Sequence, residues 1–346
     1  MVPDTEFSRT RECVLRFGWN TTCYQIVNPG IRHWHMEDAV VGYVENHGVK
    51  VVAGAPVCPE GDLPHVLEAF ENGHEVVYVG AEERVYQEAL ETQRYSISVM
   101  GAQPVWSPSS WIKSVDGDAS LRAQLNRAKN KEVRVFEWSA EQATRNPDLQ
   151  RVLVQWLSTR GLPPMHFLVE PDTLGFLNDR RVFVAERKGE VVGFTTLSPI
   201  PTRRGWLTEQ FVRAKQAPNG TVELLVDSAI RAVEKDGAQM LTMGIVPLSR
   251  KAPTNPSDPW WLRFTMGWVR AHGRRFYNFD GLEWFKDKFH PDSWDPIYVI
   301  STRRPFPFKH LYALTESFTR IPPWLAILKG AVGAVKQEAA WALSGR

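Results

Sequence analysis

The chain has 346 residues, 43% of them hydrophobic and 23% charged, which is typical of a globular protein with roughly two domains. Its 41 Lys and Arg residues nearly balance its 39 Asp and Glu residues, so the net charge is only +2. This balance excludes a globally basic nucleic-acid-binding protein, and any basic binding site has to be local. No apolar run reaches the ~18 residues of a membrane span, so we expect a cytoplasmic protein that is soluble or membrane-associated at the periphery.

The chain lacks the sequence signals of several common enzyme and metal sites. Its three cysteines, Cys13, Cys23 and Cys58, form no CxxC pair, and the first residues contain no apolar signal segment. Both observations favour the reducing cytoplasm. The motifs GxSxG, GxxxxGK[ST], GxGxxG and HExxH do not occur, which argues against serine hydrolases, P-loop enzymes and common metalloproteases. The pair His33 and His35 has no matching carboxylate or cysteine cluster, so we expect no metal site.

The first half alternates predicted helices and strands. The spacing of apolar residues predicts helices over 36–46, 63–72, 82–93 and 121–131. Runs rich in β-branched residues predict strands over 49–53, 75–80, 95–100 and 133–138. The fourth helix is basic and carries Arg122, Arg127, Lys129 and Lys131. Two interpretations stay open for it: a phosphate-binding face at a domain junction, or a solvated amphipathic helix that turns its apolar residues inward.

The second half repeats this kind of order. A helix is predicted over 147–159, followed by a hairpin of strands over 181–186 and 191–199. The central unit follows: a strand over 206–212, a Gly-containing turn, a helix over 221–236 and a strand over 240–247. Further predicted elements are a Trp-rich helix over 258–271, a strand over 276–279, a helix over 281–289 and a strand over 296–301. We therefore expect an α/β fold with a mixed sheet and two similar domains, 1–138 and 139–304.

The tail over 305–346 differs in composition from the rest of the chain. It combines many apolar residues with repeated prolines and scattered cations. One interpretation is an amphipathic segment that contacts a membrane surface. The interpretation we favour is a helical tail that docks back on the body or in a dimer.

The central unit also holds the candidate site. The turn at Asn219 and Gly220 precedes a helix N-terminus, where free N–H groups favour negative charge, and Glu223 lies in the first turn. At the end of the preceding strand, Glu209 and Arg213 can hold an amino group and a carboxyl or phosphate group, respectively. The alternative is a structural ion pair.

A second stretch, around 276–289, contributes Tyr277, Asn278, Lys286 and Lys288. The two lysines are about 200° apart on a helix and cannot both face one ligand fully. We expect one of them to bind phosphate while the other is solvated.

Five segments together resemble a known family. They are GAQPVW (101–106), RAKNK (127–131), PNGTVELL (218–225), MGIVPLS (243–249) and YNFDGLEWFKDKFHPDSWDPIYV (277–299). The chain is similar, from about residue 48 to about 303, to the C-terminal catalytic domain of the phosphatidylglycerol lysyltransferase (multiple peptide resistance factor) family. The resemblance implies a tandem of two acetyltransferase-like (GNAT-like) domains. Members that modify phosphatidylglycerol usually carry a membrane flippase as well, which does not resemble any part of this sequence.

The resemblance also implies a reaction. An aminoacyl group would pass from aminoacyl-tRNA to the hydroxyl group of a lipid or another small acceptor. No acetyl-CoA or other cofactor is implied, because the donor is already an activated ester and the coenzyme A loop Q/RxxGxG/A is absent. The alternatives are an acyl-CoA-dependent N-acyltransferase and a non-catalytic binding module.

The resemblance finally implies site residues. In the family an acidic residue and paired arginines end the central strand; Glu209 and Arg213 match, and Val212 replaces the first arginine. Glu209 would position the aminoacyl amine, while Arg213 and Lys286 would stabilise the ribose-phosphate and the developing oxyanion. The expected substrate-binding residues are Asn219, Gly220, Glu223, Tyr277, Asn278 and Lys288. The expected tRNA-binding residues are Arg122, Arg127, Lys129 and Lys131.

Overall fold

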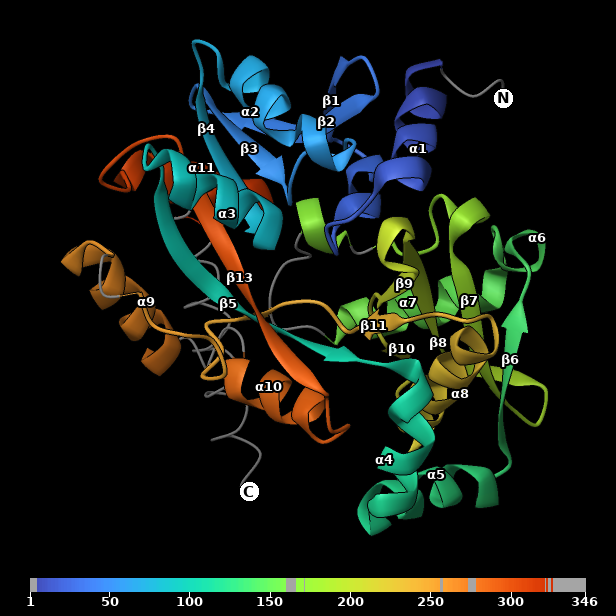
Figure 1. The fold of residues 1–346 in the computed structure, drawn as a ribbon. Helices are drawn as coiled ribbons and strands as arrows, with labels where there is room; N and C mark the ends of the chain where they lie inside the picture. The colour runs from blue at the N-terminus through green and yellow to red at the C-terminus, as the bar shows by residue number, and fades with distance from the viewer. Residues whose placement is uncertain are drawn as a thin grey trace.

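The computed structural model describes residues 5–159, 166–170, 172–255, 258–272 and 278–320, together with Pro322 and Leu325. A mixed sheet of thirteen strands runs through these residues, with helices packed on its faces (Figure 1). The strand order is β1-β2-β3-β4-β13-β5-β11-β9-β8-β7-β6, and β10 and β12 pair with β8 and β5 beside this path. The predicted α/β fold with a mixed sheet is confirmed.

The first lobe contains the N-terminal elements. They are α1 (Thr5–Phe17), β1 (Arg32–Met36), β2 (Ala39–Asn46), β3 (Val49–Ala53), α2 (Leu63–Glu71), β4 (Glu75–Ala81), α3 (Glu83–Thr92) and β5 (Ser96–Trp106). The predicted helix over 36–46 is wrong, because this segment is the turn and second strand of the antiparallel β1–β2 hairpin. Glu37 has a positive φ of 46° in that turn, and Val40 and Val41 are fully buried in the sheet.

The second lobe begins before residue 139. Its elements are α4 (Trp111–Gly117), α5 (Ala119–Asn130), β6 (Val133–Trp138), α6 (Ala140–Ala143), α7 (Pro147–Ser158), β7 (Arg181–Arg187), β8 (Glu190–Ile200), β9 (Gly205–Thr208), β10 (Val212–Arg213), α8 (Thr221–Lys235), β11 (Met240–Thr242) and β12 (Val246–Pro247). Residue 138 ends β6, which pairs with β7, and α5 packs on α8. The domain boundary expected between residues 138 and 139 therefore lies within the packed second lobe.

Two long strands join the lobes. The last elements are α9 (Trp260–His272), α10 (Phe279–Asp287), β13 (Ser293–Ser301) and α11 (Phe308–Thr319). β13 lies between β4 and β5 and is antiparallel to both, and β5 continues into the second lobe to pair with β11 (Figure 1). Trp106, at the end of β5, is buried and donates its indole N–H to the carbonyl of Phe289, 2.8 Å away. The two lobes consequently share one continuous sheet.

The described part of the tail docks on the body. Helix α11 packs on β2 and β3, with Ala313 fully buried. The Asn46 side chain donates to the Ala313 carbonyl at 3.2 Å, and Phe318 makes an edge-to-face contact with Phe167. For residues 308–319 this confirms the docking interpretation; most of the tail beyond 320 lies outside the described residues. Among the described helices, we find none with the length and apolar character needed to cross a bilayer.

Candidate functional site

Two neighbouring strands diverge at the centre of the second lobe. β9 and β11 run parallel over three residue pairs, which end at Leu207 and Thr242. Beyond these pairs, β10 joins β8 on one side and β12 joins β5 on the other. The sheet therefore opens at the ends of β9 and β11, and α8 and α10 lie next to this opening.

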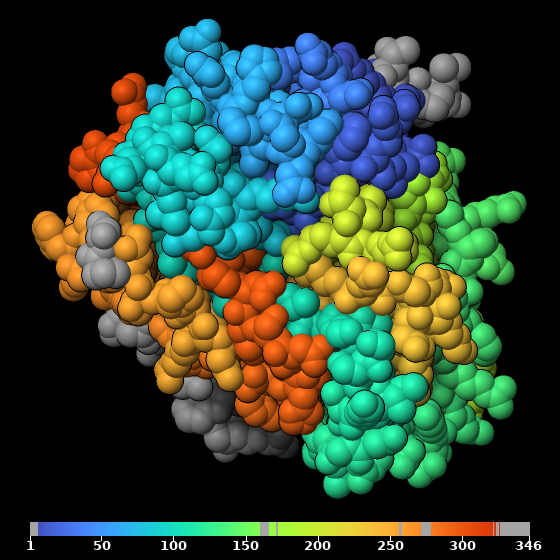
Figure 2. Space-filling model, in the orientation of Figure 1, coloured from blue at the N-terminus to red at the C-terminus, as the bar shows by residue number. Residues whose placement is uncertain are grey.

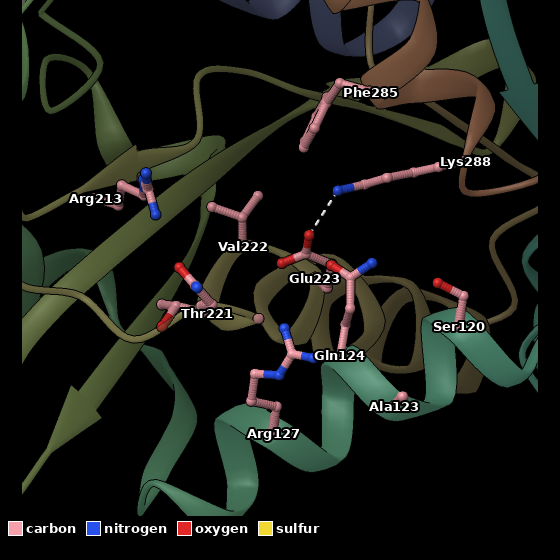
Figure 3. A pocket seen from close by; sticks show the side chains of 12 residues that line it. Ser120, Ala123, Gln124, Arg127, Arg213, Thr221, Val222, Glu223, Phe285 and Lys288 are labelled. Atoms are coloured by element: carbon pink, nitrogen blue, oxygen red, sulfur yellow. Dashed lines mark hydrogen bonds and ion pairs between the residues drawn. The ribbon is translucent and has the colours of Figure 1, made fainter. Parts of the chain in front are cut away.

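A cavity of about 650 Å³ lies between α5, the start of α8 and the end of α10 (Figure 3). Three of the cations that line it come from distant parts of the chain: Arg127 from α5, Arg213 from β10 and Lys288 from the residue after α10. The lining residues are Ser120, Ala123, Gln124, Arg127, Arg213, Asn219, Gly220, Thr221, Val222, Glu223, Phe285 and Lys288. We call this cavity the cationic pocket.

The N-terminus of α8 forms one wall of the cationic pocket. Gly220 is the N-cap residue; its φ is 93° and it makes no side-chain capping bond. A Cβ atom at this position would lie 2.2 Å from the Gln124 carbonyl oxygen, so only glycine allows α5 to approach α8 this closely. The positive end of the α8 dipole and its first-turn N–H groups add to the charge of the arginines. This wall suits a phosphate or another anion.

The pocket also contains a carboxylate. Lys288 Nζ lies 2.5 Å from Glu223 Oε1, and the ammonium sits 4.4 Å from the centre of the Phe285 ring. Only about a tenth of the Glu223 side chain is exposed. A carboxylate in a cationic pocket weakens binding of a bare anion, but it accepts hydrogen bonds from hydroxyl groups. The chemistry of the pocket therefore matches a ligand that carries both phosphate and hydroxyl groups.

Glu209 is ion-paired with Arg180 rather than with Arg213. Arg180 Nε donates to Glu209 Oε1 at 2.7 Å, and the side chains are 2% and 9% exposed. Ser198 and Gln25 also donate to Oε1. Arg180 could not be identified from the sequence, because nothing local connects it to a residue 29 positions away.

The Glu209 carboxylate keeps one oxygen available. Among the described residues, every hydrogen bond to this carboxylate ends on Oε1 and none on Oε2. The Arg180 guanidinium is fixed in turn by the Gly175 carbonyl at 2.6 Å and the Asn28 side chain at 3.1 Å. Glu209 is therefore held rigidly, and its Oε2, to which none of the described residues donates, can accept from an ammonium group.

Lys286 has an environment different from the expected one. Its side chain is 5% exposed, and its ammonium donates to the carbonyls of Met243, Gly244 and Ile245 at 2.6, 2.8 and 3.2 Å. Burial lowers the pKa of Lys286 from 10.5 to about 7. With three donors engaged, Lys286 holds the backbone between β11 and β12 where the strands diverge. Lys288 lines the cationic pocket, whereas Lys286 does not.

The remaining predicted residues lie in several places. Asn219 and Gly220 line the cationic pocket. Asn278 is exposed and caps α10, accepting from the Gly281 N–H at 3.0 Å, whereas Tyr277 lies outside the described residues.

The basic residues of α5 lie in different surroundings. Arg127 lines the pocket, and Arg122 donates to the Val115 and Asp116 carbonyls. Lys129 and Lys131 are exposed at the C-terminal end of the helix. The apolar side of α5, with Leu121 and Leu125, faces the core. The helix is thus amphipathic, and one of its cations reaches the pocket.

The described residues contain no cluster of three histidine, cysteine, aspartate or glutamate side chains arranged for a metal ion. His33 lies 2.8 Å from the Ile26 carbonyl, and His35 lies 3.1 Å from the Thr10 hydroxyl. Both histidines therefore have partners within the protein.

Three solved structures share this fold over most of the chain. The C-terminal domain described as that of a lysylphosphatidylglycerol synthetase from Agrobacterium fabrum superposes with a TM-score of 0.74, 20% identity and coverage of 91% of this chain and 96% of that one. L-PGS from Bacillus licheniformis gives a TM-score of 0.71 at 20% identity, with 87% and 92% covered. FemX superposes with a TM-score of 0.57 at 9% identity, and the match covers 90% of this chain and 97% of FemX.

Sequence comparison leads to the same group. A curated phosphatidylglycerol lysyltransferase from Staphylococcus xylosus is 24% identical over 279 residues, which is 76% of this chain and 32% of the relative. The phosphatidylglycerol lysyltransferase of Bacillus subtilis is 22% identical over 265 residues, which is 72% of this chain and 29% of the relative. The chain thus spans about a third of the length of the curated relatives it matches. A family model described as "Phosphatidylglycerol lysyltransferase, C-terminal" matches residues 12–301, and the chain belongs to this family.

Proposed function

We propose that this protein transfers an aminoacyl group from aminoacyl-tRNA to a hydroxyl group of a lipid such as phosphatidylglycerol. The observation that carries the proposal is the cationic pocket, in a chain whose relatives are named phosphatidylglycerol lysyltransferases. Arg127, Arg213 and the N-terminus of α8 supply the charge for phosphate. Glu223 supplies the acceptor for hydroxyl groups. Phosphate beside a ribose hydroxyl is what the 3′ end of a tRNA presents.

Glu209 suits the recognition of the aminoacyl amine. Its Oε2 accepts no hydrogen bond from the described residues, and Arg180 holds the carboxylate in place through Oε1. An ammonium group placed against Oε2 would orient the adjacent ester carbonyl. We assign Glu209 to the donor for this reason and treat Arg180 as its positioning residue.

The reaction needs one displacement. The acceptor hydroxyl oxygen attacks the ester carbonyl carbon, forming a new C–O bond, and the bond from that carbon to the ribose oxygen breaks. The proton lost by the acceptor hydroxyl ends on the ribose hydroxyl, so atoms and charge balance. Because the donor is an activated ester, neither a cofactor nor a covalent enzyme intermediate is required. Cations near the developing oxyanion lower the barrier electrostatically.

Label transfer tests this proposal directly. Purified protein is mixed with tRNA charged with radiolabelled amino acids and with phosphatidylglycerol in detergent micelles. We expect label in the organic-soluble fraction, and we expect Arg213→Ala to reduce it at least about tenfold. Arg16→Ala, an exposed arginine of the first lobe, serves as the matched control. The proposal fails if no label moves, and transfer from acetyl-CoA instead would favour the acyl-CoA-dependent alternative.

A further inference from the structure

Helix α9 exposes a row of aromatic side chains. Trp260, Phe264 and Trp268 are 74%, 67% and 49% exposed, and their spacing of four residues places them on one face. The opposite face is also apolar, since Leu262 is buried and Trp261 packs against the core. Helices that are apolar on all sides are normally covered on all sides. The exposed face of α9 therefore needs an explanation.

One exposed aromatic side chain of α11 lies beside α9. α9 lies at the left edge of the molecule (Figure 1), and the same edge is exposed in the space-filling view (Figure 2). The ring of Phe308, at the start of α11, is 65% exposed and contacts the inner residue Trp261 with centroids 6.0 Å apart. We call Trp260, Phe264, Trp268 and Phe308 the aromatic face.

The aromatic face is connected to the cationic pocket through α10. At the C-terminal end of α9, Arg270 forms an ion pair with Asp280 of α10 at 2.8 Å. One turn after Asp280, α10 carries Trp284, which is 70% exposed. Lys288, which lines the pocket, lies 5.9 Å from the Trp284 ring centre. A surface that contacts the aromatic face is therefore close to the elements of the proposed site.

One cation beside the aromatic face is available to an anionic partner. Of the four basic residues in 250–272, Arg250 and Arg270 pair with Asp280 and Lys251 pairs with Asp287, which leaves Arg263 outside these pairs; the acidic residue of the segment is Asp258. Asp258 is turned inward, where it accepts from Ser98 at 2.6 Å. Arg263 is exposed and lies about 60° around the helix from Trp260, at the edge of the aromatic row. Aromatic side chains flanked by arginine are typical of helices that lie in the interface of anionic bilayers.

We propose that α9 is a bilayer-docking helix, which inserts Trp260 and Phe264 among the headgroups of an anionic membrane. The inference rests on the proposed function, because an enzyme that modifies a lipid hydroxyl has to reach lipid that stays in its bilayer. A second copy of the chain fits less well. A symmetric contact through α9 brings Arg263 of both copies together, with no acidic residue on the helix to pair with them.

Vesicle binding tests the docking surface in the full chain. The variant Trp260→Ser/Phe264→Ser is compared with Phe136→Ser/Val154→Ser, whose replaced residues are 45% and 64% exposed on β6 and α7. Each protein is sedimented with vesicles of phosphatidylcholine alone and with vesicles of equal parts phosphatidylcholine and phosphatidylglycerol. We expect wild type and control to bind the anionic vesicles, and the α9 variant to bind them at least about tenfold more weakly.

Activity on two lipid forms separates this inference from the proposed function. The α9 variant should transfer label to phosphatidylglycerol in detergent micelles as fast as wild type, but more slowly to vesicles. If wild type and the α9 variant bind vesicles equally, or if neither binds, the docking inference is overturned while micelle activity still decides the proposed function. A concentration-dependent dimer that the α9 variant abolishes, without vesicle binding, would assign the surface to a second copy and also overturn it.

Discussion

Replacing Glu209 should destabilise the fold as well as impair activity, because its ion pair is buried. In Glu209→Gln the Arg180 guanidinium, only 2% exposed, loses its counter-charge but keeps the Asn28 and Gly175 bonds. Breaking a buried pair costs about 3–5 kcal/mol. Glutamine keeps an oxygen that accepts from Ser198, so we expect a loss near the lower end, about 3 kcal/mol. At ~2.1 cal/mol/K per residue, this corresponds to a fall in Tm of roughly 4 °C.

The matched control uses the same substitution in an exposed pair. Glu45 pairs with Arg32 at 2.9 Å, but their side chains are 42% and 63% exposed. Glu45→Gln should lower the free energy of unfolding by less than about 1 kcal/mol, since exposed ion pairs are solvated and screened. Urea denaturation followed by circular dichroism measures both variants. If Glu209→Gln and Glu45→Gln differ by less than about 0.5 kcal/mol, burial of the Arg180–Glu209 pair does not stabilise the fold and the reasoning is refuted.

Three further outcomes follow from the same region. Arg213→Ala should lower label transfer while changing the free energy of unfolding by less than about 0.5 kcal/mol, because the side chain is exposed; a large loss of stability in denaturation would contradict its placement. Gly220→Ala should destabilise by about 1–3 kcal/mol, since φ is 93° and its Cβ would meet the Gln124 carbonyl. The pKa of Lys286 is about 7 in the folded state and 10.5 in the unfolded state. Between pH 7 and 10.5 the unfolded state therefore binds more protons, so the free energy of unfolding should rise with pH across this range. Denaturation of Lys286→Met across the same pH range should show a flatter profile; an identical slope would contradict the lowered pKa.

The features that local signals determine could be predicted from the sequence. Glycine is among the residues found at helix N-caps, and α8 begins at Thr221 directly after Gly220. Helical geometry also predicted that Lys286 and Lys288 face different surroundings, and Lys288 lines the cationic pocket whereas Lys286 does not. The expectation that the second lysine is solvated is wrong, because Lys286 is only 5% exposed. Which of the two lines the pocket depends on how α10 packs against the segment Met243 to Ile245, and no local pattern encodes that packing.

Features that depend on the tertiary fold could not be predicted in this way. The partner of Glu209 is Arg180, which precedes β7 and is brought near by the β7–β8 hairpin and the extension of β9. The helix expected over 36–46 failed for a related reason. Its apolar residues follow one another instead of alternating, because both faces of β2 are buried in the sheet at Ala39 to Val41.

The basic end of α5 offers a way to distinguish tRNA from acyl-CoA as donor. Lys129 and Lys131 are exposed beyond Arg127, outside the cationic pocket. A small donor fills the pocket alone, whereas an acceptor stem that leaves it along α5 also places phosphates near these lysines. Each phosphate contact to a duplex contributes about 0.9 to the slope of log K against log salt.

The double variant Lys129→Ala/Lys131→Ala should therefore bind tRNA more weakly and with a slope smaller by about 2, while its affinity for coenzyme A stays at the wild-type value. Filter binding over a salt series measures the slope for wild type, for this variant and for a control. Arg16→Ala/Arg32→Ala removes two exposed cations from the first lobe and should leave the slope unchanged. Equal slopes for all three proteins would mean that the acceptor stem does not follow α5. If the α5 variant and the control lose the same affinity for tRNA, the loss reflects the lower net charge of the protein. Only an acceptor stem that lies on α5 makes two lysines there contribute more than two arginines in the first lobe.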